Sequence, residues 1–168
     1  MINKFLLSIL TMFGVGYSRY APGTLASFVT CVIFYFLYSI GYLESRGIYL
    51  IYITIIIFFL SILLIDKFSS SFNEIDAKEI VIDEFVGQNI PLFFLLFIPL
   101  NTDTYNKDFV TLIILSFFFF RFFDILKPFP INYIDNNTTG AFGIMFDDIV
   151  AAIFSIVVLI IIFFFLGG

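Results

Sequence analysis

The chain has 168 residues, of which 61% are hydrophobic and 12% are charged. About a quarter of the residues of a soluble domain are charged, so this composition indicates a membrane protein, and the length indicates a single domain over residues 1–168. The net charge of −5 argues against a nucleic-acid partner, because a phosphate backbone requires a basic face.

Two residue types limit the chemistry that the chain can perform. It has no histidine, which excludes Ser-His-Asp triads and His-ligated zinc. Its single cysteine, Cys31, lies in an apolar run without a positive neighbour, and is expected to pack rather than to react as a nucleophile. Any chemistry must therefore come from carboxylates, Arg, Lys, hydroxyl groups or a metal ion.

The apolar segments predict an all-α fold. Residues 1–16 place Lys4 before an apolar stretch, as a signal peptide does, but no small-residue cleavage site follows. We therefore expect a retained helix along the membrane interface. Five apolar segments then predict a polytopic integral membrane bundle of about five transmembrane helices, namely 24–40, 48–65, 85–100, 109–123 and 149–166. The segment 85–100 is the weakest, since it contains Pro91 and Pro99, and a re-entrant segment is its alternative.

The charges predict the orientation. With five alternating spans, six of the eight basic residues fall on the side of the N-terminus, namely Lys4, Arg19, Lys67, Lys78, Arg121 and Lys127. The positive-inside rule makes this side the cytoplasm. Most of the acidic residues fall on the same side, which the rule does not require. A group of carboxylates at one membrane face therefore needs a separate explanation.

The stretch FFFFRFFDILKPFP carries Arg121, Asp124 and Lys127 at intervals of three. At 100° per residue they lie within an arc of about 120° on one helix face, and Pro128 is expected to end that helix. An i,i+3 ion pair with snorkelling side chains is one interpretation. The other is a cationic site for an anionic group, because ionisable residues beside so many Phe side chains are costly.

Two acidic pairs are each expected to open a span. Asp83 and Glu84 precede segment 85–100, and Asp147 and Asp148 precede segment 149–166. Helix capping is one explanation, because acids stabilise helix N-termini. Capping requires only one carboxylate, however, and adjacent like charges repel each other. A hard divalent cation such as Mg²⁺ would relieve this repulsion and bind a substrate phosphate as well.

The stretch GVGYSRYAPGTLAS places glycines just before the first span and Thr24 and Ser27 at its start. Such a helix start can present N–H groups to a phosphate, although an ordinary turn is the alternative and no Walker loop is present. Together with the two acidic pairs and the Arg121–Lys127 stretch, it falls on one membrane face. This convergence predicts a site for an anionic, metal-bound group, most simply the phosphate of a lipid.

The same stretches resemble a known family. APGTLAS, IVIDEFVGQ, FRFFDILKPFPI and GIMFDDIVA occur in this order and together resemble phosphatidylglycerophosphatase A over residues 14–152. The resemblance implies an all-helical fold and Mg²⁺-dependent hydrolysis of phosphatidylglycerophosphate to phosphatidylglycerol and phosphate. It also implies a multi-pass protein of the bacterial inner membrane, with a phospholipid substrate and a site that faces the cytoplasm.

The resemblance implies roles for these residues. We expect the Mg²⁺ ligands, direct or through water, to be Asp83, Glu84, Asp147 and Asp148, with Asp124 as a further candidate. We expect the phosphate to be bound by Arg121, Lys127, Thr24 and Ser27. The expected catalytic residues are Arg121, Asp124, Lys127 and Asp147. A water activated by the metal, with a carboxylate as base, is preferred to an aspartyl-phosphate on Asp124 or Asp147.

Two other membrane functions also depend on clustered carboxylates. A CDP-alcohol phosphotransferase also uses carboxylates and a divalent metal, but its spaced glycine–aspartate signature is absent from the sequence. A membrane cation transporter would use the carboxylates as an ion path and would carry ionisable residues at mid-span. Segments 48–65 and 149–166 contain none, which favours chemistry at the interface.

Overall fold

The described part of the chain is helical. A computed structural model describes residues 2–68, 77–98, 105–138 and 140–165 and has no strand within them. Its elements are α1 (Ile2–Leu10), the 3₁₀ helix η1 (Met12–Tyr17), α2 (Pro22–Ser39), α3 (Tyr42–Phe68), α4 (Ile82–Leu95), α5 (Tyr105–Leu126), α6 (Ile131–Asn137) and α7 (Ala141–Phe165). The predicted all-α fold is confirmed, and α1 and η1 cover most of residues 1–16.

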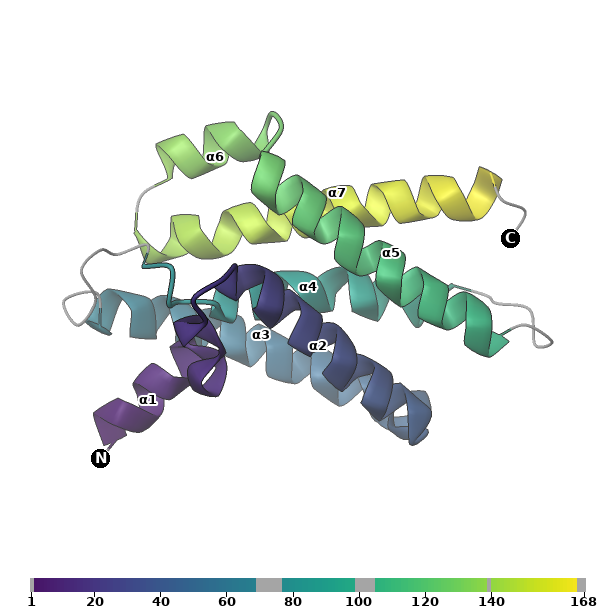
Figure 1. The fold of residues 1–168 in the computed structure, drawn as a ribbon, viewed down its shortest axis with the longest axis horizontal. Helices are drawn as coiled ribbons and strands as arrows, with labels where there is room; N and C mark the ends of the chain where they lie inside the picture. The colour runs from purple at the N-terminus through teal and green to yellow at the C-terminus, as the bar shows by residue number, and fades with distance from the viewer. Residues whose placement is uncertain (1, 69–76, 99–104, 139, 166–168) are drawn as a thin grey trace.

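The chain passes five times between the two ends of the bundle, along α2, α3, α4, α5 and α7 (Figure 1). Four of these passes contain helices that are long and apolar enough to cross a membrane: Pro22–Ser39, Arg46–Phe68, Phe109–Leu126 and Ala141–Phe165. The chain is thus a polytopic membrane protein. The remaining expected span, segment 85–100, is not among these four, because α4 has only 14 residues. Its length of about 21 Å is less than the roughly 30 Å of the hydrocarbon core.

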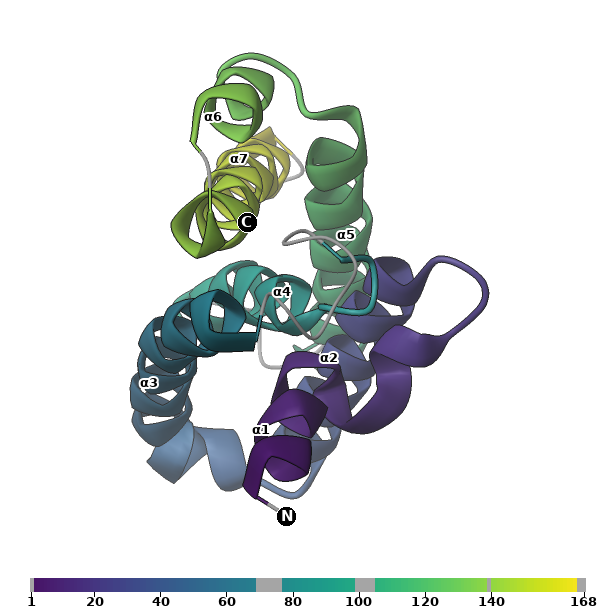
Figure 2. The same ribbon diagram turned by 90° about the vertical axis from the view of Figure 1, so that its left-hand side faces the viewer.

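α4 is the central helix of the bundle. It contacts α2, α3, α5 and α7, which surround it in the end-on view (Figure 2). This position explains how α4 tolerates polar residues. Gln88 and Asn89 are buried, and the Gln88 Nε2 donates a hydrogen bond to the Ser116 hydroxyl on α5 at 3.1 Å.

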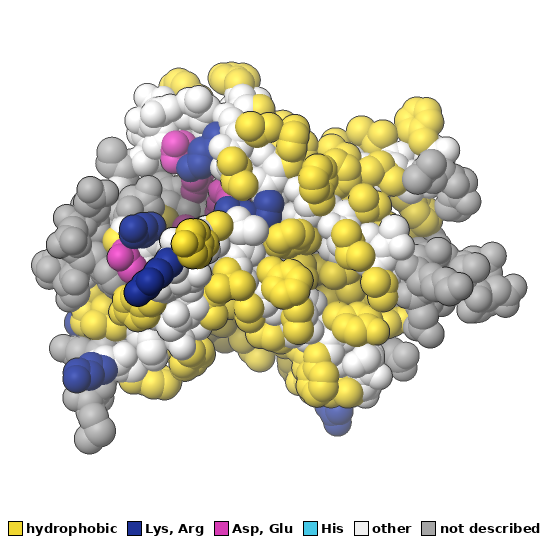
Figure 3. Space-filling model, viewed as in Figure 1, with side chains coloured by type: hydrophobic (Ala, Val, Ile, Leu, Met, Phe, Trp, Pro, Cys, Tyr) yellow, Lys and Arg dark blue, Asp and Glu magenta, His cyan; other side chains and the backbone are white. Residues whose placement is uncertain are grey.

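Large apolar side chains cover the outside of the longer helices. Phe36 on α2, Ile56 on α3 and Ile114 on α5 are each more than half exposed, and such a surface suits contact with lipid chains. Most charged side chains on the face shown in Figure 3 gather toward the end with the N-terminus. The bundle therefore has an apolar body and one polar end.

Two helix ends determine where the charges lie. α5 ends at Leu126, as Pro128 predicted, and Lys127 follows with a left-handed φ of 41°. α7 begins at Ala141, eight residues earlier than expected from the apolar pattern. Asp147 and Asp148 therefore lie inside α7 and are buried, so the capping explanation is wrong for this pair.

Close packing brings α4 against α5 and α7 at Gly87. A Cβ atom built there would lie 2.8 Å from the Phe120 ring and 3.0 Å from the Asp148 Cβ. Such contacts are too short for any side chain at this position. Glycine therefore permits the spacing of the three helices that carry the acidic residues.

We expect Gly87→Ala to lower the free energy of unfolding by about 1–3 kcal/mol, the usual cost of overpacking. Gly47→Ala in α3 is the matched control, because its Cβ would meet only the end of the Leu96 side chain, at 3.2 Å. It should be neutral or stabilise by about 0.5–1 kcal/mol through helix propensity. Thermal unfolding in detergent, followed by circular dichroism, measures both. An equal change in the free energy of unfolding for the two variants would contradict the close packing at Gly87.

Candidate active site

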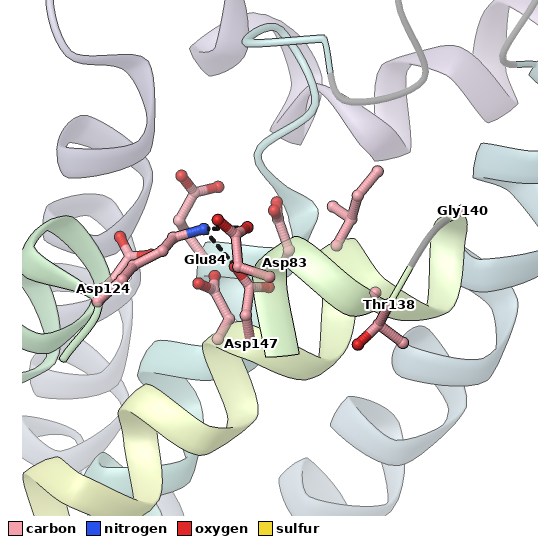
Figure 4. A pocket seen from close by; sticks show the side chains of 11 residues that line it. Asp83, Glu84, Asp124, Thr138, Gly140 and Asp147 are labelled. Carbon is pink, nitrogen blue, oxygen red and sulfur yellow. Dashed lines mark hydrogen bonds and ion pairs between the residues drawn. The ribbon is translucent and has the colours of Figure 1, made fainter. Parts of the chain in front are cut away.

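A polar pocket opens at the end of the bundle where α4 and α7 begin and α5 ends. Its volume is about 320 Å³. Figure 4 shows its acidic side chains converging from different helices. The lining residues are Asp83, Glu84, Asp124, Lys127, Asp135, Thr138, Gly140, Gly143, Ile144, Asp147 and Asp148. The structure therefore brings both predicted acidic pairs, Asp124 and Lys127 into one pocket.

Three of these acids form a group suited to a metal ion, here called the carboxylate triad: Asp83, Glu84 and Asp148. One oxygen of each lies within 4.8 Å of the others. Asp83 and Glu84 lie in the first turn of α4 and Asp148 lies in α7. The close packing of these two helices at Gly87 thus joins residues that are distant in sequence.

The triad has unused binding capacity. The Oδ1 of Asp83, the Oε2 of Glu84 and the Oδ2 of Asp148 are buried and have no hydrogen-bond partner. Buried polar atoms are normally paired, and hard divalent cations such as Mg²⁺ prefer carboxylate oxygens. The donor set of the triad therefore fits a cation of this kind.

The electrostatics of α4 agree with this fit. Burial raises the pKa of Asp83 well above its usual value, and the negative charge of the adjacent Glu84 raises it further. Burial also raises the pKa of Glu84. Both causes penalise the charged carboxylates, and a bound cation would offset them.

Lys127 lies between two carboxylates at the edge of the pocket. Its Nζ donates to the Asp147 Oδ2 at 2.5 Å and to the Asp135 Oδ1 at 2.6 Å, as the dashed lines in Figure 4 show. Burial lowers the pKa of Lys127, but these two hydrogen bonds outweigh it and raise the pKa above its usual value. Lys127 therefore stays charged at neutral pH.

Arg121 joins α5 to α4. Its Nη1 lies 2.5 Å from the Asp124 Oδ2, the predicted i,i+3 ion pair, and 3.7 Å from the Glu84 Oε1. It is not among the residues that line the pocket. In this arrangement Arg121 fixes two carboxylates of the site, and its predicted contact with phosphate stays a prediction.

Comparison with known proteins places this geometry in a family. The chain matches the family model for phosphatidylglycerophosphatase A over residues 8–163. The chain belongs to the phosphatidylglycerophosphatase A family. It is therefore an enzyme, a phosphatase, and the resemblance seen in its sequence motifs is confirmed.

Individual relatives extend this comparison. Over 144 residues the chain is 37% identical to the phosphatidylglycerophosphatase A of Haemophilus influenzae. This alignment covers 86% of this chain and 80% of the relative. The chain is 31% identical to the Escherichia coli K12 protein of the same name, over 85% of this chain and 74% of the relative. It is 32% identical to a Bacteroides thetaiotaomicron protein named "Putative phosphatidylinositol-3-phosphatase", over 86% of this chain and 85% of the relative. No solved structure matches the chain significantly.

The first turn of α2 meets the site through a glycine. A Cβ built on Gly23 would lie 1.8 Å from the Glu84 Oε1, so any larger residue would have to displace this carboxylate. Thr24 and Ser27 do not line the pocket, and the buried Ser27 hydroxyl donates to the Gly23 carbonyl at 3.1 Å. Phosphate binding by these two hydroxyl groups stays a prediction.

The sequence reasoning did not assign Asp135 and Thr138 to the site. Asp135 lies on α6, whose chain turns back after Pro128 and Pro130 toward the pocket. The signal was present, since two prolines close to Lys127 indicate a reversal of the chain. Which acid such a reversal brings to Lys127 depends on the tertiary structure.

We expect Gly23→Ala to displace the Glu84 carboxylate and lower kcat/KM for phosphatase activity roughly 10- to 100-fold, because small displacements of a positioned group are costly. Ala21→Gly is the control in the same turn. Ala21 has a left-handed φ of 42°, which glycine adopts without strain, so this variant should stay active. If Gly23→Ala keeps full activity, the close approach is not required.

Proposed function

We propose that this protein hydrolyses the phosphate monoester of phosphatidylglycerophosphate to phosphatidylglycerol and inorganic phosphate, using Mg²⁺. Two relatives are named phosphatidylglycerophosphatase A, and the helices supply the membrane setting that a phospholipid substrate requires. The observation that carries the proposal is the carboxylate triad, in which one buried oxygen of each acid has no hydrogen-bond partner. The triad lies in the same pocket as the charged Lys127.

We assign Mg²⁺ to the carboxylate triad, bound directly or through water. When bound, it would polarise the phosphate ester and lower the pKa of water. Asp147 was expected in the same ligand set, but its Oδ2 is engaged by Lys127. Its Oδ1 is buried without a hydrogen-bond partner and is therefore available, but Asp147 does not belong to the triad. We propose that Asp147 binds the metal through a water molecule.

The cationic residues have separate roles in this proposal. Lys127 lines the pocket and would hold the phosphate and stabilise the negative charge that develops in the transition state. Arg121 would keep Glu84 and Asp124 in place. A water molecule is the proposed nucleophile, and Asp124 or Asp147 would accept its proton, since both line the pocket outside the triad.

We place the protein in the bacterial inner membrane with its pocket toward the cytoplasm. The excess of Lys and Arg at the end of the bundle that carries the pocket supports this orientation. A cation transporter is favoured by no observation, because the 17 residues of α7 that follow Asp148 contain no charged side chain. The acids gather near one end of the helix rather than along it.

Phosphate release from phosphatidylglycerophosphate tests the reaction. With Mg²⁺ the purified protein should release phosphate, and EDTA should abolish this activity. Asp148→Asn should lower kcat/KM at least about 100-fold, which is more than the loss of a residue that only supports a metal ligand usually causes. Asp66→Asn makes the same chemical change at an exposed position on α3 and should retain activity.

The outcomes separate the parts of the proposal. A folded protein that releases no phosphate would contradict the substrate assignment, and phosphatidylinositol 3-phosphate assayed in parallel tests the other substrate that a relative's name suggests. Activity that EDTA does not affect would leave the phosphatase in place and remove the metal from it.

Metal binding should weaken as the pH falls. A cation binds the deprotonated carboxylates, and the raised pKa of Asp83 means that protons compete at a higher pH than for ordinary acids. Calorimetric titration with Mn²⁺ should show an affinity that decreases as the pH is lowered from neutral toward the usual carboxylate range. In that range, binding should be accompanied by the release of protons from the carboxyl groups. An affinity that does not change with pH would contradict binding at Asp83.

A further inference from the structure

An apolar groove runs along the outside of the bundle between α2 and α5. Its volume is about 390 Å³, and only hydrophobic side chains line it. Cys31 and Ile113, each 6% exposed, form its floor, while Val32 and Ile114, 50% and 60% exposed, form its sides. Because both helices are long enough to span a membrane, the groove opens toward lipid chains.

One end of the groove lies near the phosphatase site along α5, although no described residue lines both the groove and the acidic pocket. At 100° per residue, Phe117 shares an arc of about 60° with Arg121 and Asp124, and all three therefore lie on one face of the helix. Phe117 lines the groove and precedes Arg121 by one turn, or about 6 Å. The apolar groove thus begins one turn from the guanidinium that contacts Glu84.

α2 shows the same proximity from the other side of the groove. Phe28 lines the groove and makes an edge-to-face contact with Phe117, with ring centroids 6.2 Å apart. It lies just over one turn beyond Gly23, whose backbone meets the Glu84 carboxylate. Phe28 and Phe117 therefore mark the end of the groove nearest the acidic pocket.

We propose that this groove holds one acyl chain of the lipid whose phosphate occupies the acidic pocket. This inference rests on the proposed function, since it requires a phospholipid substrate. The groove has no polar lining and extends from Phe28 to Tyr35 over about 11 Å, so it suits a hydrocarbon segment. Its open side allows the chain to enter from the bilayer without leaving the hydrocarbon.

The benefit of the groove lies in orientation. In a bilayer the acyl chain is already in an apolar medium, so no hydrophobic transfer favours the groove, and packing is the remaining contribution. Once the pocket holds the phosphate, the chain is confined near the groove, and the two contacts reinforce each other. The groove would thereby align the ester for reaction and favour lipid phosphates over soluble ones.

Filling the groove tests the inference. We compare KM for phosphatidylglycerophosphate with KM for the same headgroup without acyl chains, glycerophosphoglycerophosphate. Val32→Trp and, separately, Ile114→Trp should raise the ratio of lipid KM to soluble KM about tenfold. Val157→Trp on α7 is the matched control, because Val157 is 49% exposed and does not line the groove. Its ratio should equal that of the wild type.

Photo-crosslinking provides a measurement that does not depend on turnover. Phosphatidic acid with a photoreactive acyl chain should label peptides of α2 and α5 that contain Val32 and Ile114. Phosphatidylcholine with the same chain should label them at least about tenfold less, because its phosphate is a diester with a bulky cation. Equal labelling by the two lipids would show an ordinary lipid-facing surface and overturn the inference.

These experiments separate the inference from the proposed function. If the wild-type protein hydrolyses neither substrate, the proposed function fails. If it hydrolyses the lipid but both groove variants keep the wild-type KM ratio, the acyl site is wrong and the phosphatase stands.

Discussion

The concentration of negative charge at the shared end of α4, α5 and α7 is the constraint on which the rest of the structure depends. Among the described residues, the cations that form ion pairs at this site are Arg121 and Lys127. Arg121 pairs most closely with Asp124 and Lys127 pairs with Asp147, and neither of these acids belongs to the carboxylate triad. The carboxylate triad is thus left with an excess of buried negative charge. Removing charge from water is costly unless it is compensated, and a divalent cation is the simplest compensation.

Glycines make this concentration possible. Gly87 allows α4 to approach α5 and α7, and Gly23 allows the first turn of α2 to approach Glu84. With a Cβ at either position, the helices would separate or a carboxylate would move. The geometry of the site therefore depends on positions without side chains as much as on the acids, and both glycines lie inside the motifs that first indicated the family.

Much of the fold was predictable from the sequence, because long apolar segments in lipid must pair their own backbone N–H and C=O groups, and an α-helix does this within one segment. The acidic pairs and the helix end before Pro128 were predictable for similar local reasons. The start of α7 was not. Acids are expected outside an apolar span, whereas the bundle accommodates Asp147 and Asp148 inside the helix, a property of the neighbouring helices rather than of the segment itself.

The contact between Lys127 and Asp135 and the placement of Ser27 were unpredictable for a different reason. Both depend on the direction in which a side chain or a chain reversal points, which the local sequence does not specify. The Ser27 hydroxyl is directed to its own helix, although its position near the start of a span was compatible with phosphate binding. Residue type and spacing identified the polar end of the bundle, and the tertiary packing decided which side chains line its pocket.

The shortness of α4 has a consequence for the biogenesis of the protein. α4 carries Asp83 and Glu84 in its first turn and Gln88 and Asn89 further along. Such a segment partitions poorly from the translocon into lipid by itself, because each of these residues opposes insertion. Its polar groups find partners or shelter only against other helices, as the bond from Gln88 to Ser116 illustrates. α4 must therefore enter the membrane together with its neighbours, and α5, which carries Ser116, is synthesised after it.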